Sequence, residues 1–202
     1  MRIGILGTGV IATALVRGIA GEGHRITVSE RSAGNAAALA EEVGVGVAAN
    51  REVLDRSDVV VLGLMAEAAS EVLSALRFRP DHLVVSLMAG ASLEEVAAMV
   101  APAEARAVMI PFPGIARGGS PVLALGDVPL VEAICGARNR VFALKNGAEL
   151  DAALCAQAVL SPVARMVDDA ARWLGDRVNN GEEGEAFLRM LVASSLDGMP
   201  VG

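Results

Sequence analysis

Short runs of apolar residues recur along the first two thirds of the chain, separated by segments with helical spacing. The runs are nearly continuous rather than alternating, which is typical of strands buried on both faces of a parallel sheet. They predict strands at residues 2–6, 25–29, 45–48, 59–64, 82–87, 105–110, 120–125 and 140–144. The alternation with helices predicts a Rossmann-type α/β domain over residues 1–146, with a doubly wound, mostly parallel sheet.

A glycine-rich segment, Gly7-Thr8-Gly9-Val10-Ile11-Ala12, follows the first strand and fits the G-x-G-x-x-G/A pattern. Gly7 permits a tight turn, Gly9 lets a pyrophosphate approach the backbone, and Ala12 lets the next helix pack closely on the strand. The helix N-terminus adds unpaired N–H groups and a partial positive charge. Because the strand, helix and second strand all follow in order, we predict a dinucleotide at residues 7–12. The alternative is a glycine turn that holds no ligand.

The end of the second strand carries the residues that choose between NAD and NADP. Glu30 suits the ribose 2′-hydroxyl of NAD, and its charge would repel a 2′-phosphate. Ser29, Arg31 and Ser32 suit the 2′-phosphate of NADP, Arg31 through charge-assisted hydrogen bonds. The residues alone leave both cofactors open.

Ligands of such sheets bind outside the carboxyl ends of the strands. Those ends are predicted near Gly7, Ser29, Leu64–Met65, Met88–Gly90 and Ile110–Pro113. The loop from Pro111 to Gly119 is expected over the nicotinamide side of the cleft, with Pro113 and Arg117 toward the substrate. Arg117 can receive a carboxylate, because a guanidinium binds it bidentately. The alternative is a solvated arginine on a glycine loop.

From Ala148 onward, apolar residues recur at helical spacing, with an interruption at Pro162. A second helix is predicted over residues 183–196, after a turn at Asn179-Asn180-Gly181. Residues 147–202 therefore predict a short C-terminal helical hairpin, whose apolar faces have no partner in a finished Rossmann sheet. We expect them to form a homodimer with a second copy. The alternative is that they fold back over their own sheet edge.

Composition narrows the partners and the compartment. The net charge of −7 and the scattered arginines argue against a nucleic-acid surface. No uncharged apolar run reaches the length of a membrane span, and the N-terminus does not resemble a signal peptide, so no membrane partner is expected. Cys135 and Cys155 indicate neither a metal site nor a disulfide framework, so a cytoplasmic protein without a metal is expected. His24 and His82 are expected on exposed loops.

Several segments resemble the pyrroline-5-carboxylate reductases, which use a nicotinamide cofactor to reduce a cyclic imine to proline. The similar segments are residues 3–9 with 14–18, 28–32, 49–52 with 57–60, 86–93 and 149–152. The resemblance implies that Asn50, Ala89 and Gly90 contact the cofactor, together with Leu64 and Met65 after the fourth strand. It also implies a helical dimerisation region, and it favours NADP over NAD.

The substrate side departs from that family's pattern. Its Val-Lys-Pro reads Leu64-Met65-Ala66 here, and its Met-Pro-Asn-Thr-Pro reads 109–113, Met-Ile-Pro-Phe-Pro. Its Thr-Ala-x-Ser-Gly-Ser-Gly-Pro, which holds the substrate carboxylate, reads 155–162, Cys-Ala-Gln-Ala-Val-Leu-Ser-Pro. Ser161 is the candidate catalytic proton donor and substrate ligand that remains. The alternative is that Ser161 is a helix-kink residue before Pro162.

Together these features predict an NAD(P)H-dependent oxidoreductase that reduces the C=N bond of a small cyclic imine, as in proline biosynthesis. Two alternatives stay open. One is a dinucleotide-binding regulatory protein without catalysis. The other is a related reductase with a different acceptor, such as an imine of another shape or a deazaflavin.

Overall fold

The computed structural model describes residues 1–178 and 180–198, and the chain divides into two compact units, Met1–Leu150 and Asp151–Gly202. The strands of the first unit are β1 Arg2–Leu6, β2 Arg25–Ser29, β3 Gly46–Ala48, β4 Val59–Leu62, β5 Leu83–Ser86, β6 Glu104–Pro111, β7 Pro121–Gly126 and β8 Arg140–Leu144. Its helices are α1 Val10–Ile19, α2 Ala33–Val43, α3 Asn50–Asp55, α4 Ala66–Ser74, α5 Leu93–Val100 and α6 Val128–Cys135, with a 3-10 turn, η1, at Pro113–Ala116.

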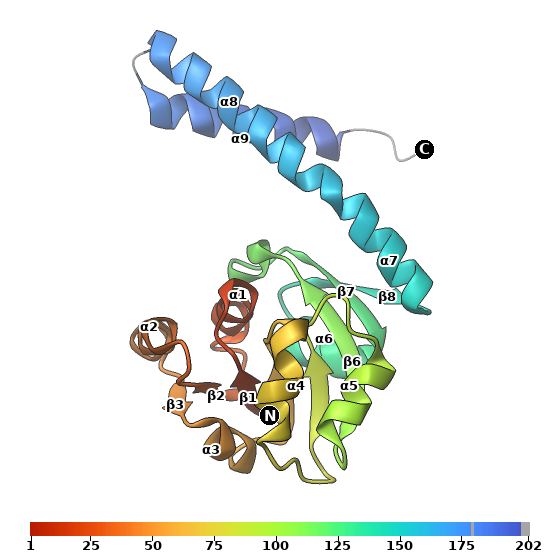
Figure 1. Ribbon diagram of the computed structural model, residues 1–202. Coiled ribbons are helices and arrows are strands. Elements are labelled where there is room, and N and C mark those ends of the chain that lie inside the picture. The colour runs from red at the N-terminus through yellow and green to blue at the C-terminus, as the bar shows by residue number, and fades with distance from the viewer. Residues whose placement is uncertain (179, 199–202) are drawn as a thin grey trace. The chain divides into compact units, whose positions relative to one another are not determined.

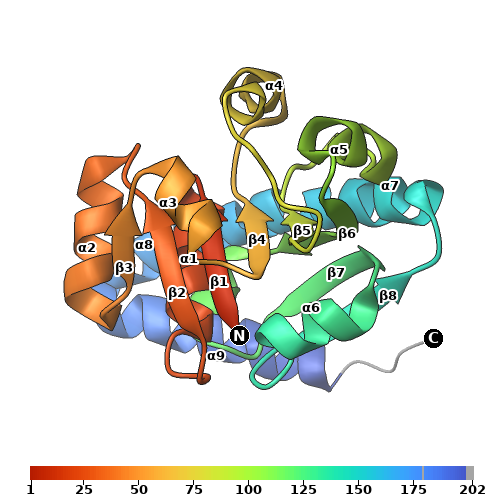
Figure 2. The same cartoon turned by 90° about the horizontal axis from the view of Figure 1, so that it is seen from below.

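The eight strands form one sheet in the order β3-β2-β1-β4-β5-β6-β7-β8, which Figure 2 shows from one side to the other. All neighbouring strands are parallel except β6 and β7, which pair antiparallel. β7 and β8 are again parallel to each other. The prediction of a mostly parallel, doubly wound Rossmann-type sheet is therefore confirmed.

Both faces of the sheet are buried at its central strands, which explains why these strands are continuously apolar. Side chains alternate between two cores along each strand. Ile3, Ile5, Val59 and Val61 face one core, which α1, α2 and α6 complete, whereas Leu6, Val60 and Leu62 face the other. Helices α3, α4 and α5 contribute Val53, Leu73 and Val96 to that second core.

Local sequence signals set several helix ends. Ser92 caps α5: its hydroxyl accepts from the Glu95 backbone N–H, and the Glu95 carboxylate accepts from the Ser92 N–H. α2 ends at Gly44, whose φ of 69° is the left-handed conformation common after helices. The turns that follow the parallel strands β1 to β6 lie at the carboxyl ends of these strands, where ligands of such sheets bind.

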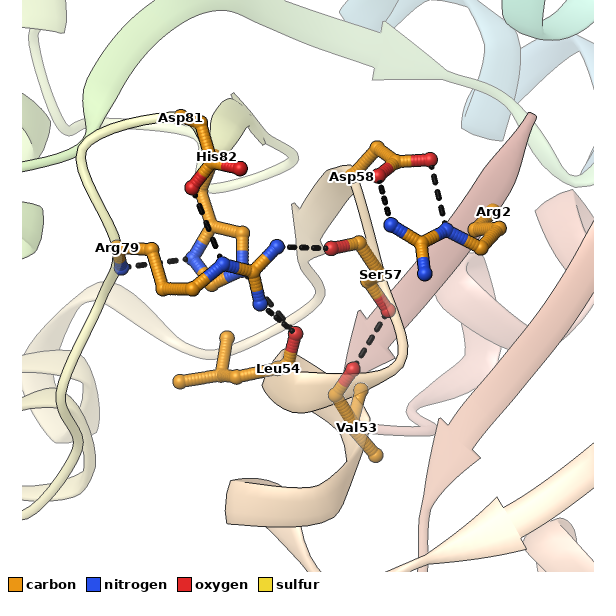
Figure 3. Close-up of polar contacts among 8 residues, drawn as sticks. All are labelled: Arg2, Val53, Leu54, Ser57, Asp58, Arg79, Asp81 and His82. Atoms are coloured by element: carbon orange, nitrogen blue, oxygen red, sulfur yellow. Dashed lines mark hydrogen bonds and ion pairs between the residues drawn. The ribbon is translucent and has the colours of Figure 1, made fainter.

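The amino ends of β4 and β5 are tied by a dense set of hydrogen bonds, shown in Figure 3. The Arg79 guanidinium donates to the Leu54 and Ser57 carbonyls at 3.0 and 2.9 Å. His82 Nδ1 accepts from the Arg79 N–H, and its Nε2 donates to the Leu54 carbonyl at 3.1 Å. His82 is thus neutral and fully buried, and burial lowers its pKa, so the expectation of an exposed loop histidine was wrong.

The other histidine also differs from expectation. His24, between α1 and β2, is half-buried, and its Nε2 lies 3.1 Å from the Ile134 carbonyl in α6. Both histidines therefore contact backbone carbonyls of elements far away in the sequence. That role is invisible in the local pattern.

The second unit is helical. α7 Gly147–Ala156 enters it, a 3-10 turn, η2, follows at Gln157–Val159, and α8 Leu160–Val178 and α9 Gly181–Asp197 form an antiparallel pair, visible in Figure 1. Pro162 lies in the first turn of α8, where its missing N–H is tolerated. The predicted turn begins at Asn179, which lies outside the described residues. Asn180 caps α9 by accepting from the Glu183 N–H at 3.2 Å.

Small residues bring α8 and α9 together. A Cβ added at Gly184 would lie 3.1 Å from the Gly175 backbone nitrogen and 3.2 Å from the Ala171 carbonyl oxygen. Large apolar side chains elsewhere on η2, α8 and α9 are exposed. They are Val159, Leu160, Val163, Met166, Trp173, Val178, Phe187, Met190, Leu191 and Leu196. Within this unit the hairpin therefore leaves apolar surface uncovered.

By length and composition alone, the helical run Gly147–Val178 could cross a membrane, although a helix that packs against protein passes the same test. α8 also carries charged residues that pair with one another: Arg172 lies 2.5 Å from Asp168 and 3.0 Å from Asp169. The expectation of no membrane partner stays a prediction.

Candidate functional site

The site predicted from the sequence lies where the winding of the sheet reverses. β1 connects to β2 on one side, and its other neighbour, β4, leads to β5 on the opposite side. Such a switch point leaves a crevice at the carboxyl ends of the strands. The turn after β1 opens there, next to the turn after β4.

Two glycines touch at this point. Gly7 has a φ of 92°, and a Cβ added to it would lie 2.5 Å from the Gly63 carbonyl oxygen. A Cβ at Gly63, just after β4, would lie 2.8 Å from the Gly7 carbonyl oxygen and 2.7 Å from the Ala12 Cβ. The predicted roles of Gly7 and Ala12 in a tight, closely packed turn are confirmed. Gly63 was not predicted, because only the tertiary approach of β4 shows that it must be glycine.

The outer side of the turn is open. Nothing lies within 4 Å of a Cβ added at Gly9, which precedes α1 as its N-cap and carries no capping side chain. The first turn of α1 has no acidic residue, so its free N–H groups and partial positive charge face outward uncompensated. A pyrophosphate fits these donors. Val10 beside them is 79% exposed.

Ser29 has a different role from the one predicted. It is fully buried, and its hydroxyl accepts from the Gly7 N–H at 2.8 Å. The expectation that this hydroxyl holds a 2′-phosphate is therefore not met. Ser29 supports the turn from inside, whereas Glu30 and Arg31, the next two residues, are exposed.

Two further side chains hold the turn by the Thr8 carbonyl. Asn35 in the first turn of α2 donates to it at 2.6 Å, and Thr13 in α1 donates at 3.2 Å. Thr8 itself is fully buried, and its hydroxyl has no hydrogen-bond partner in the described chain. Asn35 was missed in the sequence because it lies in a different helix, outside the glycine motif.

The remaining candidate cofactor residues all follow strand ends. Asn50 begins α3 just after β3, and Leu64 and Met65 lie between β4 and α4. Ala89 and Gly90 are exposed in the turn after β5, and Gly90 has a φ of 88°. Ile11, like Val10, is in the first turn of α1. Their contacts with a cofactor stay predictions.

The loop after β6 packs against α1, the helix that the glycine-rich turn opens. Pro113 opens η1, and the Ile115 backbone packs against Gly18, where a Cβ would collide with the Ile115 carbonyl. Gly18 is nine residues beyond Gly9, roughly 13 Å along α1. The Arg117 side chain makes no hydrogen bond within the described residues. A substrate role for Pro113 and Arg117 therefore stays a prediction.

Ser161 lies on the other unit, in the first turn of α8, and is exposed. Its catalytic role stays a prediction. Burial raises the pKa of the Cys135 thiol in α6 to about 11, so this cysteine is protonated and unreactive at neutral pH.

Comparison with known proteins agrees with this geometry. Residues 2–90 match the family model of the NADP oxidoreductase coenzyme F420-dependent family. Pyrroline-5-carboxylate reductase 2 of Macaca fascicularis is 32% identical over 146 residues, which cover 65% of this chain and 45% of that protein. This chain resembles the pyrroline-5-carboxylate reductases. It spans about half the length of that curated relative.

Solved structures of pyrroline-5-carboxylate reductases share the fold. The enzyme from Streptococcus pyogenes superposes with a TM-score of 0.81 at 20% identity, covering 100% of this chain and 82% of that chain. The Plasmodium falciparum pyrroline carboxylate reductase, solved with NADP bound, gives 0.81 at 14% identity, covering 98% and 78%. A reductive aminase from Aspergillus terreus, solved with NADPH and ethyl levulinate, gives 0.68 at 20%, covering 97% and 73%. At these identities the similarity shows the fold alone.

Proposed function

We propose that this chain is an NADPH-dependent oxidoreductase that reduces the C=N bond of a small cyclic imine, as pyrroline-5-carboxylate reductases do. The observation that carries the proposal is the Gly7–Gly63–Ala12 contact beside an open Gly9, at the switch point of the sheet. A bound nicotinamide cofactor supplies the hydride, and the chain binds, orients and shields it. The N–H groups at the start of α1 hold the pyrophosphate.

NADP is the cofactor we infer, with NAD as the alternative. Arg31 is exposed beside the end of β2, where its guanidinium can bind a 2′-phosphate bidentately. Glu30, equally exposed, must then turn toward solvent. Structures with the same fold from Plasmodium falciparum and Aspergillus terreus contain NADP and NADPH, which supports the choice.

In this proposal Pro113 and Arg117 of the first unit contact the substrate, and Arg117 receives its carboxylate. Ser161 of the second unit stays the candidate proton donor and substrate ligand. We infer a cytoplasmic homodimer, in which the uncovered apolar residues of α8 and α9 pack against a second copy. The paired charges of α8 then stay in water at the edge of that interface.

Two other functions remain as competitors. A regulatory protein that binds the dinucleotide without catalysis is favoured by Val159 and Leu160, whose side chains stand where the resembled family has a glycine and a serine. A reductase with a different acceptor is favoured by the fold similarity to a reductive aminase and by the family model of coenzyme F420-dependent oxidoreductases.

The test is a paired assay on the purified chain. NADPH and NADH are titrated by fluorescence, and NADPH absorbance is then followed with 1-pyrroline-5-carboxylate added. Binding with turnover supports the proposal, and binding without turnover contradicts it and leads to imine, ketone–amine and deazaflavin panels. Light scattering on the same sample should give twice the 20.6 kDa chain mass if the dimer forms.

A further inference from the structure

Two side chains donate to the Thr8 carbonyl, and one of them comes from outside the glycine-rich segment and its helix. Thr13 belongs to α1, the helix that the turn itself opens, but Asn35 comes from α2 and bonds across 27 residues of sequence. A carbonyl oxygen can accept only from the amide nitrogen of an asparagine, so this contact fixes the orientation of the Asn35 amide.

Holding this carbonyl has a consequence for the next residue. In a trans peptide the C=O of one residue and the N–H of the next point in opposite directions. With the Thr8 oxygen held inward by Asn35 and Thr13, the Gly9 N–H must point outward, into the space that is open around Gly9. A rotated peptide would instead turn a carbonyl oxygen toward the phosphates and repel them.

We propose that Asn35 is a positioning residue for the dinucleotide, which aims the Gly9 N–H at the pyrophosphate by holding the Thr8 carbonyl. The proposal rests on the proposed cofactor binding. Asn35 also lies three residues after Ser32. It therefore links two segments of the proposed site, the loop expected at the ribose and the turn expected at the pyrophosphate.

A purely structural role for Asn35 would be to dock α2 on α1. The chain provides a matched control for that role, because Arg17 in α1 and Glu42 in α2 form a second tie between these helices, at 2.6 and 3.1 Å. The Arg17–Glu42 pair is exposed and does not touch the glycine-rich turn. Glu42→Gln weakens the docking of α2 and leaves the Thr8 carbonyl held.

The experiment titrates NADPH and adenosine 2′-monophosphate into wild type, Asn35→Ala, Asn35→Asp and Glu42→Gln. We expect Asn35→Ala to lower the affinity for NADPH about tenfold, which is the effect of one lost hydrogen bond. Asn35→Asp keeps the shape but sets a carboxylate against the carbonyl, so its loss should be larger. Adenosine 2′-monophosphate lacks the pyrophosphate, so its affinity should change less than about twofold in every variant. The affinity of Glu42→Gln for NADPH should also change less than about twofold.

Three results would overturn the inference. They are unchanged NADPH affinity in Asn35→Ala, an equal loss for both ligands, and an equal loss in Glu42→Gln. Thermal unfolding of each variant checks that the fold is kept, which the exposed position of Asn35 favours. A wild-type chain that binds neither NADPH nor NADH would contradict the proposed function as well, so the two failures are distinguishable.

Discussion

The two edges of the sheet in residues 1–150 are built in opposite ways. At the carboxyl ends of β1 and β4, glycines touch glycines, and the N–H groups at the start of α1 face open space. At the amino ends of β4 and β5, Arg79 and His82 satisfy the carbonyls of Leu54 and Ser57 (Figure 3). One edge leaves donors free for a ligand, and the other uses its donors to hold the fold.

This contrast predicts which property, cofactor affinity or stability, each kind of substitution should change. Changes at the carboxyl edge should alter cofactor affinity, because they move N–H groups that a ligand needs. Changes at the amino edge should alter the free energy of unfolding and leave affinity alone, because these groups already have partners. The substitutions below test whether affinity and stability depend on these separate edges.

The largest effect is expected from Gly63→Ala. Its new methyl group would meet the Gly7 carbonyl and the Ala12 Cβ at distances that real Cβ atoms do not reach, so the turn must move. We expect NADPH affinity to fall by about 100-fold and the free energy of unfolding by roughly 2–4 kcal/mol. Fluorescence titration and urea unfolding measure the two.

Gly21→Ala is the matched control for Gly63→Ala. Gly21 has a φ of 87°, so alanine is strained there, but nothing lies within 4 Å of the added Cβ. The control should lose about 1 kcal/mol of stability and keep its NADPH affinity. Equal losses of affinity in both variants would show that the Gly7–Gly63 contact has no special role.

A smaller loss, of stability only, is expected from Arg79→Ala. The Leu54 and Ser57 carbonyls each lose one part-buried hydrogen bond, and the Leu54 carbonyl keeps the one from His82, so the change should cost about 2–3 kcal/mol in urea unfolding. NADPH affinity should stay within twofold of wild type. Arg56→Ala removes an exposed pair with Glu52 and should change neither quantity measurably. A tenfold affinity loss in Arg79→Ala would mean that the two edges are coupled.

The smallest effect concerns pH. Burial, reinforced by the charge of Arg79, lowers the pKa of His82, while Asp81 and Asp55 partly oppose this. The unfolded chain therefore takes up a proton that the folded chain resists. The stability due to neutral His82 is complete above the ordinary pKa of 6.5 and is lost as the pH falls below it.

His82→Gln removes this titration. Urea unfolding at pH 7.5 and 5.5 should show a smaller loss of stability in the variant than in wild type. The affinity for NADPH at pH 7.5 should not change. An identical loss in both chains would mean that groups other than His82 account for the acid sensitivity.

The difference between local patterns and tertiary contacts explains which features the sequence could predict. The mostly parallel, doubly wound sheet and the turn at residues 7–12 follow from local patterns: continuous apolar runs, a glycine spacing and an adjacent helix. Gly63, Asn35 and the inward role of Ser29 depend on which strands and helices become neighbours, and no local pattern contains that information. His82 was misjudged for the same reason, because its carbonyl partner is 28 residues away in the sequence.

The central claim is that the carboxyl edge alone receives the dinucleotide, and amide NMR on the 15N-labelled chain tests it most directly. On addition of NADPH, we predict shifts for the N–H signals of Gly9, Val10, Ile11 and Arg31, with those of Leu54, Ser57, Arg79 and His82 unmoved. Shifts confined to the second group, or no shifts at saturating NADPH, would contradict the account.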